Sequence, residues 1–156
     1  MLGRITESPT VISPRWLGRS RDRRDLYLAV VDDIRDWPSS VVRLPPRFVS
    51  VIALDTRDRS HKEVREFARK LLDQSTGYVC SWGPDAGRID TSFDLEFIAM
   101  EEQGGMPVGF VTTSQHDDES LDEALWFAVF VAYASEVETA SVLVVTEPQR
   151  ADHSQP

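Results

Sequence analysis

The chain contains a single cysteine, Cys80, among its 156 residues. One thiol cannot form an intramolecular disulfide, and it excludes a zinc site built from several cysteines. Long apolar runs are also lacking, since the longest, residues 124–134, has about half of the roughly 20 residues that a membrane-spanning helix needs. The arginine-rich N-terminus lacks the apolar segment of a secretory signal. We therefore expect a protein of the reducing cytoplasm that does not enter a membrane.

Several motifs that would identify an activity are also missing. No glycine spacing matches Gly-x-Gly-x-x-Gly or a Walker phosphate loop, and no Gly-x-Ser-x-Gly segment marks an α/β-hydrolase. Asp55 follows a predicted strand as in aspartate-nucleophile phosphatases, but Arg57 stands where their second acid is expected. The sequence therefore predicts no cofactor and no metal ion.

Negative charge dominates the chain, which carries a net charge of -9. Between residues 85 and 147 the one cation is Arg88, among many acidic residues, and such a surface repels a phosphate backbone. Residues 1–24, by contrast, hold six arginines against two acids. This basic segment could bind nucleic acid or an acidic partner, but more often such a segment is solvated or docks on its own acidic domain. The charge pattern therefore disfavours nucleic acid as a partner.

Length and pattern predict one domain. Residues 1–24 mix Gly, Ser, Pro and Arg without a period and are expected to be irregular. Residues 25–147 are long enough to bury a core of their own, and residues 148–156 have the composition of a disordered tail.

Four apolar segments predict strands, and a fifth segment could be a strand or one helical turn. The four are residues 48–54, 78–82, 108–113 and 141–145, and the fifth is residues 26–31.

Amphipathic segments between these strands predict helices. Two of them begin at capping boxes, Ser60 with Glu63 and Ser120 with Glu123. The middle helix is expected to begin near residues 91–92. Alternating strands and helices predict a three-layer α/β fold, Rossmann-like or flavodoxin-like, with a mostly parallel sheet of four to five strands and helices on both faces.

Parallel strands deliver their carboxyl ends to one edge of a sheet, where ligands bind in α/β folds. Polar and aromatic side chains follow three of the predicted strands. We therefore predict a ligand site at this edge, built from Asp55, Trp82, Asp85, Thr112, Thr113 and His116.

His116 is the one histidine expected in this cleft, and its near-neutral titration suits a general acid or base. Asp118 and Glu119 follow it and complete a set of candidate catalytic residues. These acids also precede a helix, where the helix dipole alone favours negative charge. Trp82 could stack on a ligand ring or fill the core. Cys80 is interpreted as a buried small hydrophobe rather than a nucleophile.

The last helix, from residue 121 to residue 133, is apolar on all sides. Such a helix is either enclosed by its own domain or covered by a partner. We predict a homodimer through Trp126, Phe127 and Phe130.

Two blocks carry a resemblance to a family. They are Tyr-Val-Cys-Ser-Trp-Gly-Pro-Asp at residues 78–85 and Thr-Thr-x-x-His-x-Asp-Glu-Ser-Leu at residues 112–121. Over about residues 48–145 the chain resembles an uncharacterised bacterial domain family with no assigned activity. The resemblance implies a bacterial, cytoplasmic α/β domain. Gln115 departs from the tryptophan common at that position, which argues against an aromatic ligand contact there.

Three hypotheses about function follow. The first is a binding or regulatory module that recognises a small ligand or a protein at the edge of the sheet. The second is a hydrolase, with or without the help of a metal ion, that uses His116 with nearby carboxylates. The third, which the acidic surface disfavours, is a nucleic-acid accessory acting through residues 15–24.

Overall fold

The computed structural model describes residues 14–21, 24–38, 44–45, 47–104, 111–132 and 141–148. These residues form six strands, three α-helices and one 3-10 helix. The strands are β1 (Arg15–Arg19), β2 (Asp25–Val30), β3 (Val49–Ala53), β4 (Tyr78–Trp82), β5 (Thr112–His116) and β6 (Ser141–Thr146). The helices are η2 (Ile34–Asp36), α1 (His61–Asp73), α2 (Ala86–Glu102) and α3 (Leu121–Phe130).

All six strands belong to one mixed sheet with the order β1-β2-β6-β3-β4-β5. Neighbouring strands from β2 to β5 pair in parallel, and only β1 runs antiparallel to its neighbour, β2. The prediction of an α/β fold with a mostly parallel sheet is confirmed. The predicted strand count of four to five is one too low, because β1 forms within the segment that composition predicted to be irregular.

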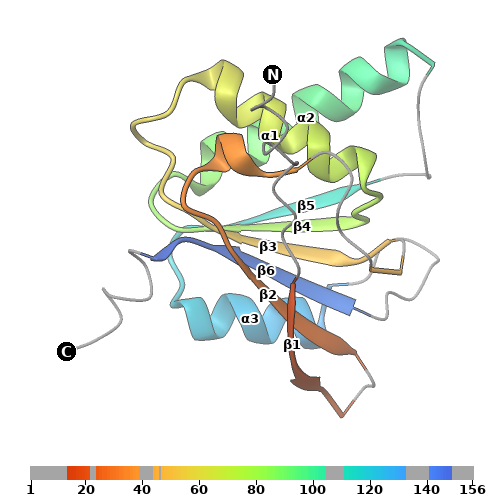
Figure 1. The fold of residues 1–156 in the computed structure, drawn as a ribbon, viewed down its shortest axis with the longest axis vertical. Coiled ribbons are helices and arrows are strands. Elements are labelled where there is room, and N and C mark those ends of the chain that lie inside the picture. The colour runs from red at the N-terminus through yellow and green to blue at the C-terminus, as the bar shows by residue number, and fades with distance from the viewer. Residues whose placement is uncertain are drawn as a thin grey trace, which may run out of the picture.

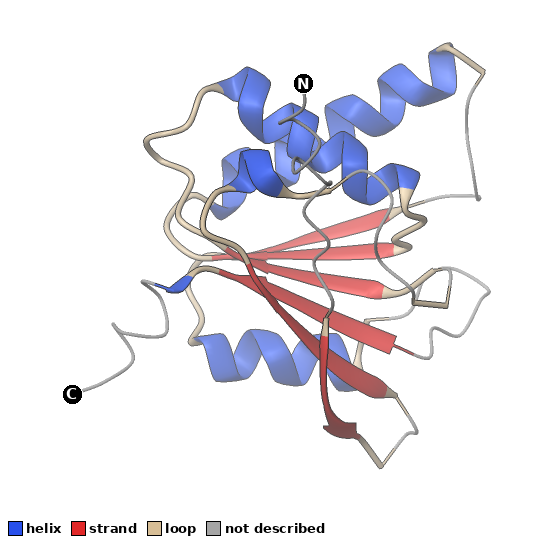
Figure 2. Ribbon diagram, in the orientation of Figure 1, coloured by secondary structure: helices blue, strands red, loops and turns tan. Residues whose placement is uncertain are grey.

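Helices cover both faces of the sheet (Figures 1 and 2). α1 and α2 lie on one face together with η2, and α3 lies on the other. The chain moves across the sheet in one direction from β3 to β5 and returns from β5 to β6. A right-handed crossover requires the returning connection to lie on the opposite face, which is where α3 is found.

Two apolar clusters lie on the two sides of the sheet. The side of α1 and α2 buries Phe67, Leu71 and Phe93, among others. The side of α3 buries Val51, Val144 and further residues, and Phe127 packs against them. All five residues of β3 are buried, as expected of a central parallel strand covered on both faces.

Both predicted capping boxes are present. The hydroxyl of Ser60 accepts a hydrogen bond from the backbone N–H of Glu63, and the Glu63 carboxylate accepts one from the backbone N–H of Ser60. Ser120 and Glu123 repeat this arrangement at the start of α3. These pairs fix the first residue of each helix because they satisfy N–H groups that the first turn leaves without partners.

The basic N-terminal segment contributes to the domain itself. Arg24 is 1% exposed, and its guanidinium donates a 2.7 Å hydrogen bond to the carbonyl oxygen of Ala128 near the end of α3. Arg19 forms an ion pair of 2.9 Å with Asp25 on the neighbouring strand. The described part of this segment therefore packs on its own domain, as one of the two interpretations of the sequence expected.

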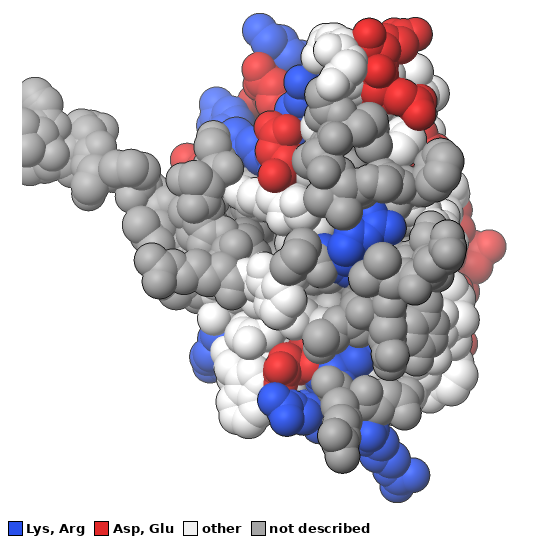
Figure 3. All heavy atoms as spheres, turned by 90° about the vertical axis from the view of Figure 1, so that its right-hand side faces the viewer, with Lys and Arg blue, Asp and Glu red and all other residues white. Residues whose placement is uncertain are grey.

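Figure 3 faces the edge of the sheet at which the parallel strands begin. Acidic side chains gather at the upper right of this view, acidic and basic side chains are mixed at the upper left, and mainly basic side chains lie at the bottom. Within the described ranges, no helix has the length and apolar character needed to cross a membrane.

Candidate ligand site at the carboxyl edge of the sheet

The carboxyl ends of β2, β6, β3, β4 and β5 meet at one edge in that order. The predicted residues at this edge do not form one cluster. The structure places them in three groups: Asp55 beside β6, Asp85 at the start of α2, and Trp82 with His116 on the side of α3.

Trp82 and His116 are neighbours. They are partners in the register of β4 and β5, and both contact Glu119. The indole N–H of Trp82 donates a 2.9 Å hydrogen bond to the carbonyl oxygen of Glu119, and Nδ1 of His116 lies 2.9 Å from the Glu119 carboxylate. The candidate catalytic pair of His116 and Glu119 is therefore in direct contact, whereas Asp118 is exposed.

Asp85 belongs to a different group. Its carboxylate accepts a 2.7 Å hydrogen bond from the hydroxyl of Thr56 and lies 3.2 Å from Nε of Arg88. Arg88 also donates hydrogen bonds to the carbonyl oxygens of Thr56 and Arg59. Asp85 and Arg88 thus fasten the loop after β3 to the start of α2.

Thr112 and Thr113 were predicted at the wrong end of their strand. β5 begins at Thr112, which pairs with the first residue of β4, Tyr78, so both threonines lie at the amino edge. The prediction followed the apolar run of residues 108–111, but the strand is built from the more polar residues after it. Residues 105–110 lie outside the described residues.

A cavity of about 360 Å³ lies at the ends of β2, β6 and β3, and we call it the rim cavity. Asp55 lines it, but Trp82, Asp85 and His116 do not. Its charged lining residues are Asp32, Asp33, Asp55, Asp58, Glu147, Arg57 and Arg59. Sequence reasoning missed most of them, because their proximity depends on β6 pairing between β2 and β3.

The two arginines of the rim cavity are matched by two of its carboxylates. Arg57 pairs with Asp55 at 2.7 Å, and Arg59 pairs with Asp33 at 3.0 Å. The Glu147 carboxylate accepts a 2.9 Å hydrogen bond from the backbone N–H of Asp55, which joins the ends of β6 and β3. With Asp32, Asp58 and Glu147 in addition, negative charge exceeds positive charge in the lining.

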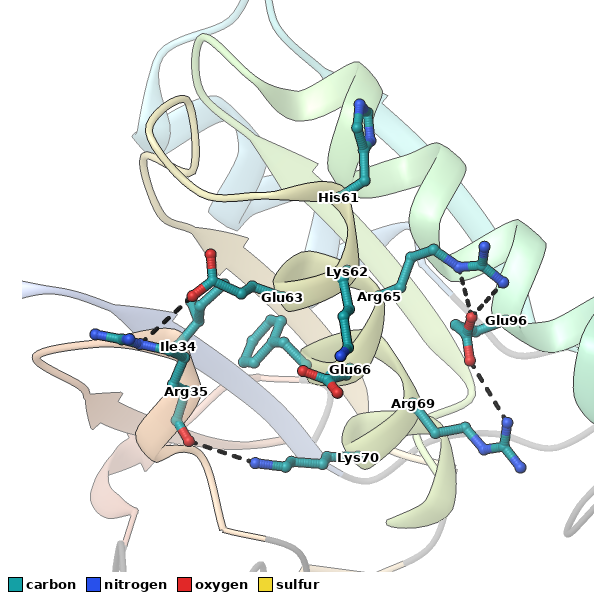
Figure 4. A pocket seen from close by; sticks show the side chains of 11 residues that line it. Ile34, Arg35, His61, Lys62, Glu63, Arg65, Glu66, Arg69, Lys70 and Glu96 are labelled. Carbon is teal, nitrogen blue, oxygen red and sulfur yellow. Dashed lines mark hydrogen bonds and ion pairs between the residues drawn. The ribbon is translucent and has the colours of Figure 1, made fainter.

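A larger groove of about 750 Å³ lies over α1, between η2 and α2 (Figure 4). Its charged side chains largely engage one another: Arg65 and Arg69 both reach Glu96, and Arg35 reaches Glu63. The groove runs along the outer face of α1 and shares only Ile34 with the rim cavity. We therefore assign the candidate site to the rim cavity.

The described residues hold no group of three His, Cys, Asp or Glu side chains suited to a metal ion. The metal-assisted form of the hydrolase hypothesis therefore has no structural support within the described ranges.

Comparison with known proteins places this chain in a family. The family model of a domain of unknown function, DUF7684, matches residues 27–154. The chain belongs to this family. The match covers β3, β4, β5 and β6 in full and the last four of the six residues of β2, and it leaves out β1. A search of curated proteins finds no match to the chain.

Ion pairing at Asp33 leads to a prediction about pH. Hydrogen bonds from Arg35, with a smaller contribution from the charge of Arg59, lower the pKa of the Asp33 carboxyl to about 2. A lowered pKa stabilises the folded state above about pH 4, and this contribution is lost as the pH falls through 2. The pairs lie close to solvent, so we expect an effect of the order of 1 kcal/mol.

Urea unfolding between pH 7 and pH 2 measures this contribution in the native protein and in Asp33→Asn. The variant should be less stable at pH 7, and the difference should vanish near pH 2. Asp122→Asn, an exposed acid on α3, is the matched control and should not show this pattern. An Asp33→Asn difference that is the same at both ends of the pH range would contradict the assignment.

Proposed function

We propose that this domain is a binding module whose rim cavity takes a small organic cation. The observation that carries the proposal is a cavity of about 360 Å³ with an excess of carboxylates over guanidinium groups. Its volume is within the range of sites for small ligands, and its place at the carboxyl ends of parallel strands is where α/β folds bind ligands.

The chemistry of the lining favours an amine or guanidinium ligand. The Arg57 and Arg59 charges are already paired with Asp55 and Asp33, so the lining offers acceptors rather than donors to an incoming group. Asp32 and Asp58 are exposed at the mouth and have the freedom to turn toward a cation. Charge-assisted hydrogen bonds from a ligand ammonium group to these carboxylates would orient it.

Thermal unfolding in the presence of putrescine, spermidine and agmatine tests this proposal. A ligand that binds only the folded state raises Tm, and at a hundredfold excess over Kd the gain is about 2.7 kcal/mol, or roughly 5–10 °C for a domain of this size. We expect the Asp32→Asn, Asp58→Asn double variant to lose the gain.

Asp118→Asn is the matched control, because it removes an exposed carboxylate from the other half of the same edge. It should retain the gain. No rise in Tm with any of the three amines, or an equal loss in the control, would contradict a cation site in the rim cavity.

The surface of α3 supports a second property, self-association. The indole of Trp126 is 60% exposed and lies 5.6 Å from the ring of Phe130, which is 37% exposed. Phe127, also predicted at the interface, instead turns inward, where its ring lies 4.7 Å from His116. An exposed aromatic pair on a helix that is otherwise packed on its sheet is suited to an isologous contact with a second copy.

Charge on α3 restricts how two copies could pair. The first turn carries Asp122 and Glu123, and the last turn has no basic residue. Parallel helices would bring the acidic ends together, so an antiparallel pair centred on Trp126 and Phe130 is the favourable arrangement.

Light scattering on the native protein is expected to show a dimer that Trp126→Asp converts to a monomer. Ile98→Asp is the matched control, since Ile98 is a similarly exposed apolar residue on α2, across the sheet. A monomeric native protein at high concentration would refute the dimer, as would dissociation by the control alone.

A further inference from the structure

Three side chains beneath α3 are linked in series. The hydroxyl oxygen of Ser114 lies 2.7 Å from Nε2 of His116, and Nδ1 of the same ring lies 2.9 Å from the carboxylate of Glu119. A serine on one ring nitrogen and a carboxylate on the other is the connectivity by which a histidine activates a hydroxyl nucleophile.

Local structure explains why these residues meet. Ser114 and His116 are two positions apart on β5, so alternation along the strand places both side chains on the same face. The turn after β5 brings Glu119 back to the ring, one residue before the N-cap of α3. His116 and Glu119 were predicted from the sequence, but Ser114 was not. The alternation of side chains along a strand could have revealed Ser114, because it places residues 114 and 116 on the same face.

The surroundings restrict the ring and leave the serine within reach. The His116 side chain is 4% exposed, because Phe127 covers its ring. Ser114 is half-buried on β5, which is the edge strand of the described sheet, and the Glu119 side chain is 36% exposed. A ring held on three sides has little freedom to leave the geometry in which Nε2 faces the hydroxyl.

Two other potential nucleophiles lie nearby, but both are held in their protonated forms. Burial raises the pKa of the Cys80 thiol to about 12, and burial also raises the pKa of the Tyr78 hydroxyl. Each also has a hydrogen bond with the Ser114 hydroxyl, which lowers its pKa by less than burial raises it. It is Ser114 whose hydroxyl lies 2.7 Å from the imidazole. Ser114 is therefore the hydroxyl in this cluster that is placed to lose its proton to a base.

The cluster lies beside the topological switch point of the sheet. The connection after β4 leads to α2 on one face, and the connection after the adjacent β5 leads to α3 on the other. In α/β folds, ligands bind at the carboxyl ends of adjacent strands whose connections diverge to opposite faces in this way. The ends of β4 and β5 are separate from the rim cavity, which lies at β2, β6 and β3.

We propose that Ser114 is a nucleophile toward small activated esters, with His116 as its general base and Glu119 as the residue that positions His116. The serine oxygen would form a bond to the acyl carbon while its proton passes to Nε2. The bond from the acyl carbon to the alcohol oxygen would break, and the departing oxygen would take the proton from Nε2. Water would then release the acid from Ser114 by the same proton route in reverse.

A fluorophosphonate probe tests this assignment, since labelling needs only the first half of the reaction. Its phosphorus bonds to the serine oxygen, fluoride leaves, and the serine proton is released through His116. We expect intact-mass analysis to show one adduct, peptide mapping to place it on Ser114, and Ser114→Ala to remove it.

Ser81→Ala is the matched control. Ser81 lies on the neighbouring strand β4, beside Gln115 rather than Ser114 in the register, and its buried hydroxyl has no recorded hydrogen-bond partner among the described residues. This variant should label at the native rate. Labelling of the folded native protein at another residue, or no labelling at all, would overturn the proposal.

His116→Gln and Glu119→Gln separate a chemical role from a structural one. Both variants should lower the maximal rate of labelling, and His116→Gln, which removes the base, should lower it by on the order of 10²-fold. The probe concentration that gives half of the maximal rate should stay unchanged. Ester hydrolysis should fall in parallel, and circular dichroism should confirm that each variant folds. If Glu119→Gln and His116→Gln label at the native rate, the linked side chains have no part in activating Ser114.

Discussion

The insertion of β6 between β2 and β3 is the interaction on which the rest of this fold depends. Among the described strands, β2 pairs in parallel with β6 alone, so β1 and β2 are hydrogen-bonded to the rest of the described sheet through β6. The strand is suited to this place because its first five residues, Ser-Val-Leu-Val-Val, are buried and mostly β-branched, as a strand enclosed on both faces requires. The rim cavity exists because this pairing brings the end of β2 and the end of β3 to either side of Glu147.

The polar groups on the α3 side of the sheet present a different problem, because buried polar atoms destabilise a fold unless they are paired. Here they pair with one another: Ser114 with His116, His116 with Glu119, and the Trp82 indole with the backbone of Glu119. A network that satisfies its members gives the turn after β5 a single conformation. The same rigidity would serve catalysis, because an activated serine needs its base held in place before a substrate arrives.

Motifs of a few adjacent residues predicted the helices and strands that are stabilised by contacts within the same segment. The capping boxes at Ser60 and Ser120 set the starts of α1 and α3, and the apolar run before Asp55 identified β3. α2 was expected to begin near residues 91–92 but begins at Ala86, directly after Asp85, which makes no side-chain capping hydrogen bond of the kind that marks the starts of α1 and α3. β5 was misplaced because its residues, Thr-Thr-Ser-Gln-His, lack the apolar pattern that marks a strand and belong to the sheet through pairing with β4.

The candidate site was predicted only in outline for the same reason. Parallel strands correctly implied a shared edge, and the placement of Trp82 beside His116 followed from it. Which side chains meet there depends on long-range pairing and on the direction that each connection takes after its strand. β4 and β5 send their connections to opposite faces, so Asp85 turns toward Thr56 and Arg88 while His116 turns toward Glu119. One side of the sheet therefore holds two chemically distinct places: the acidic rim cavity, which we propose binds a cation, and the linked Ser114, His116 and Glu119, which we propose carry out acyl transfer.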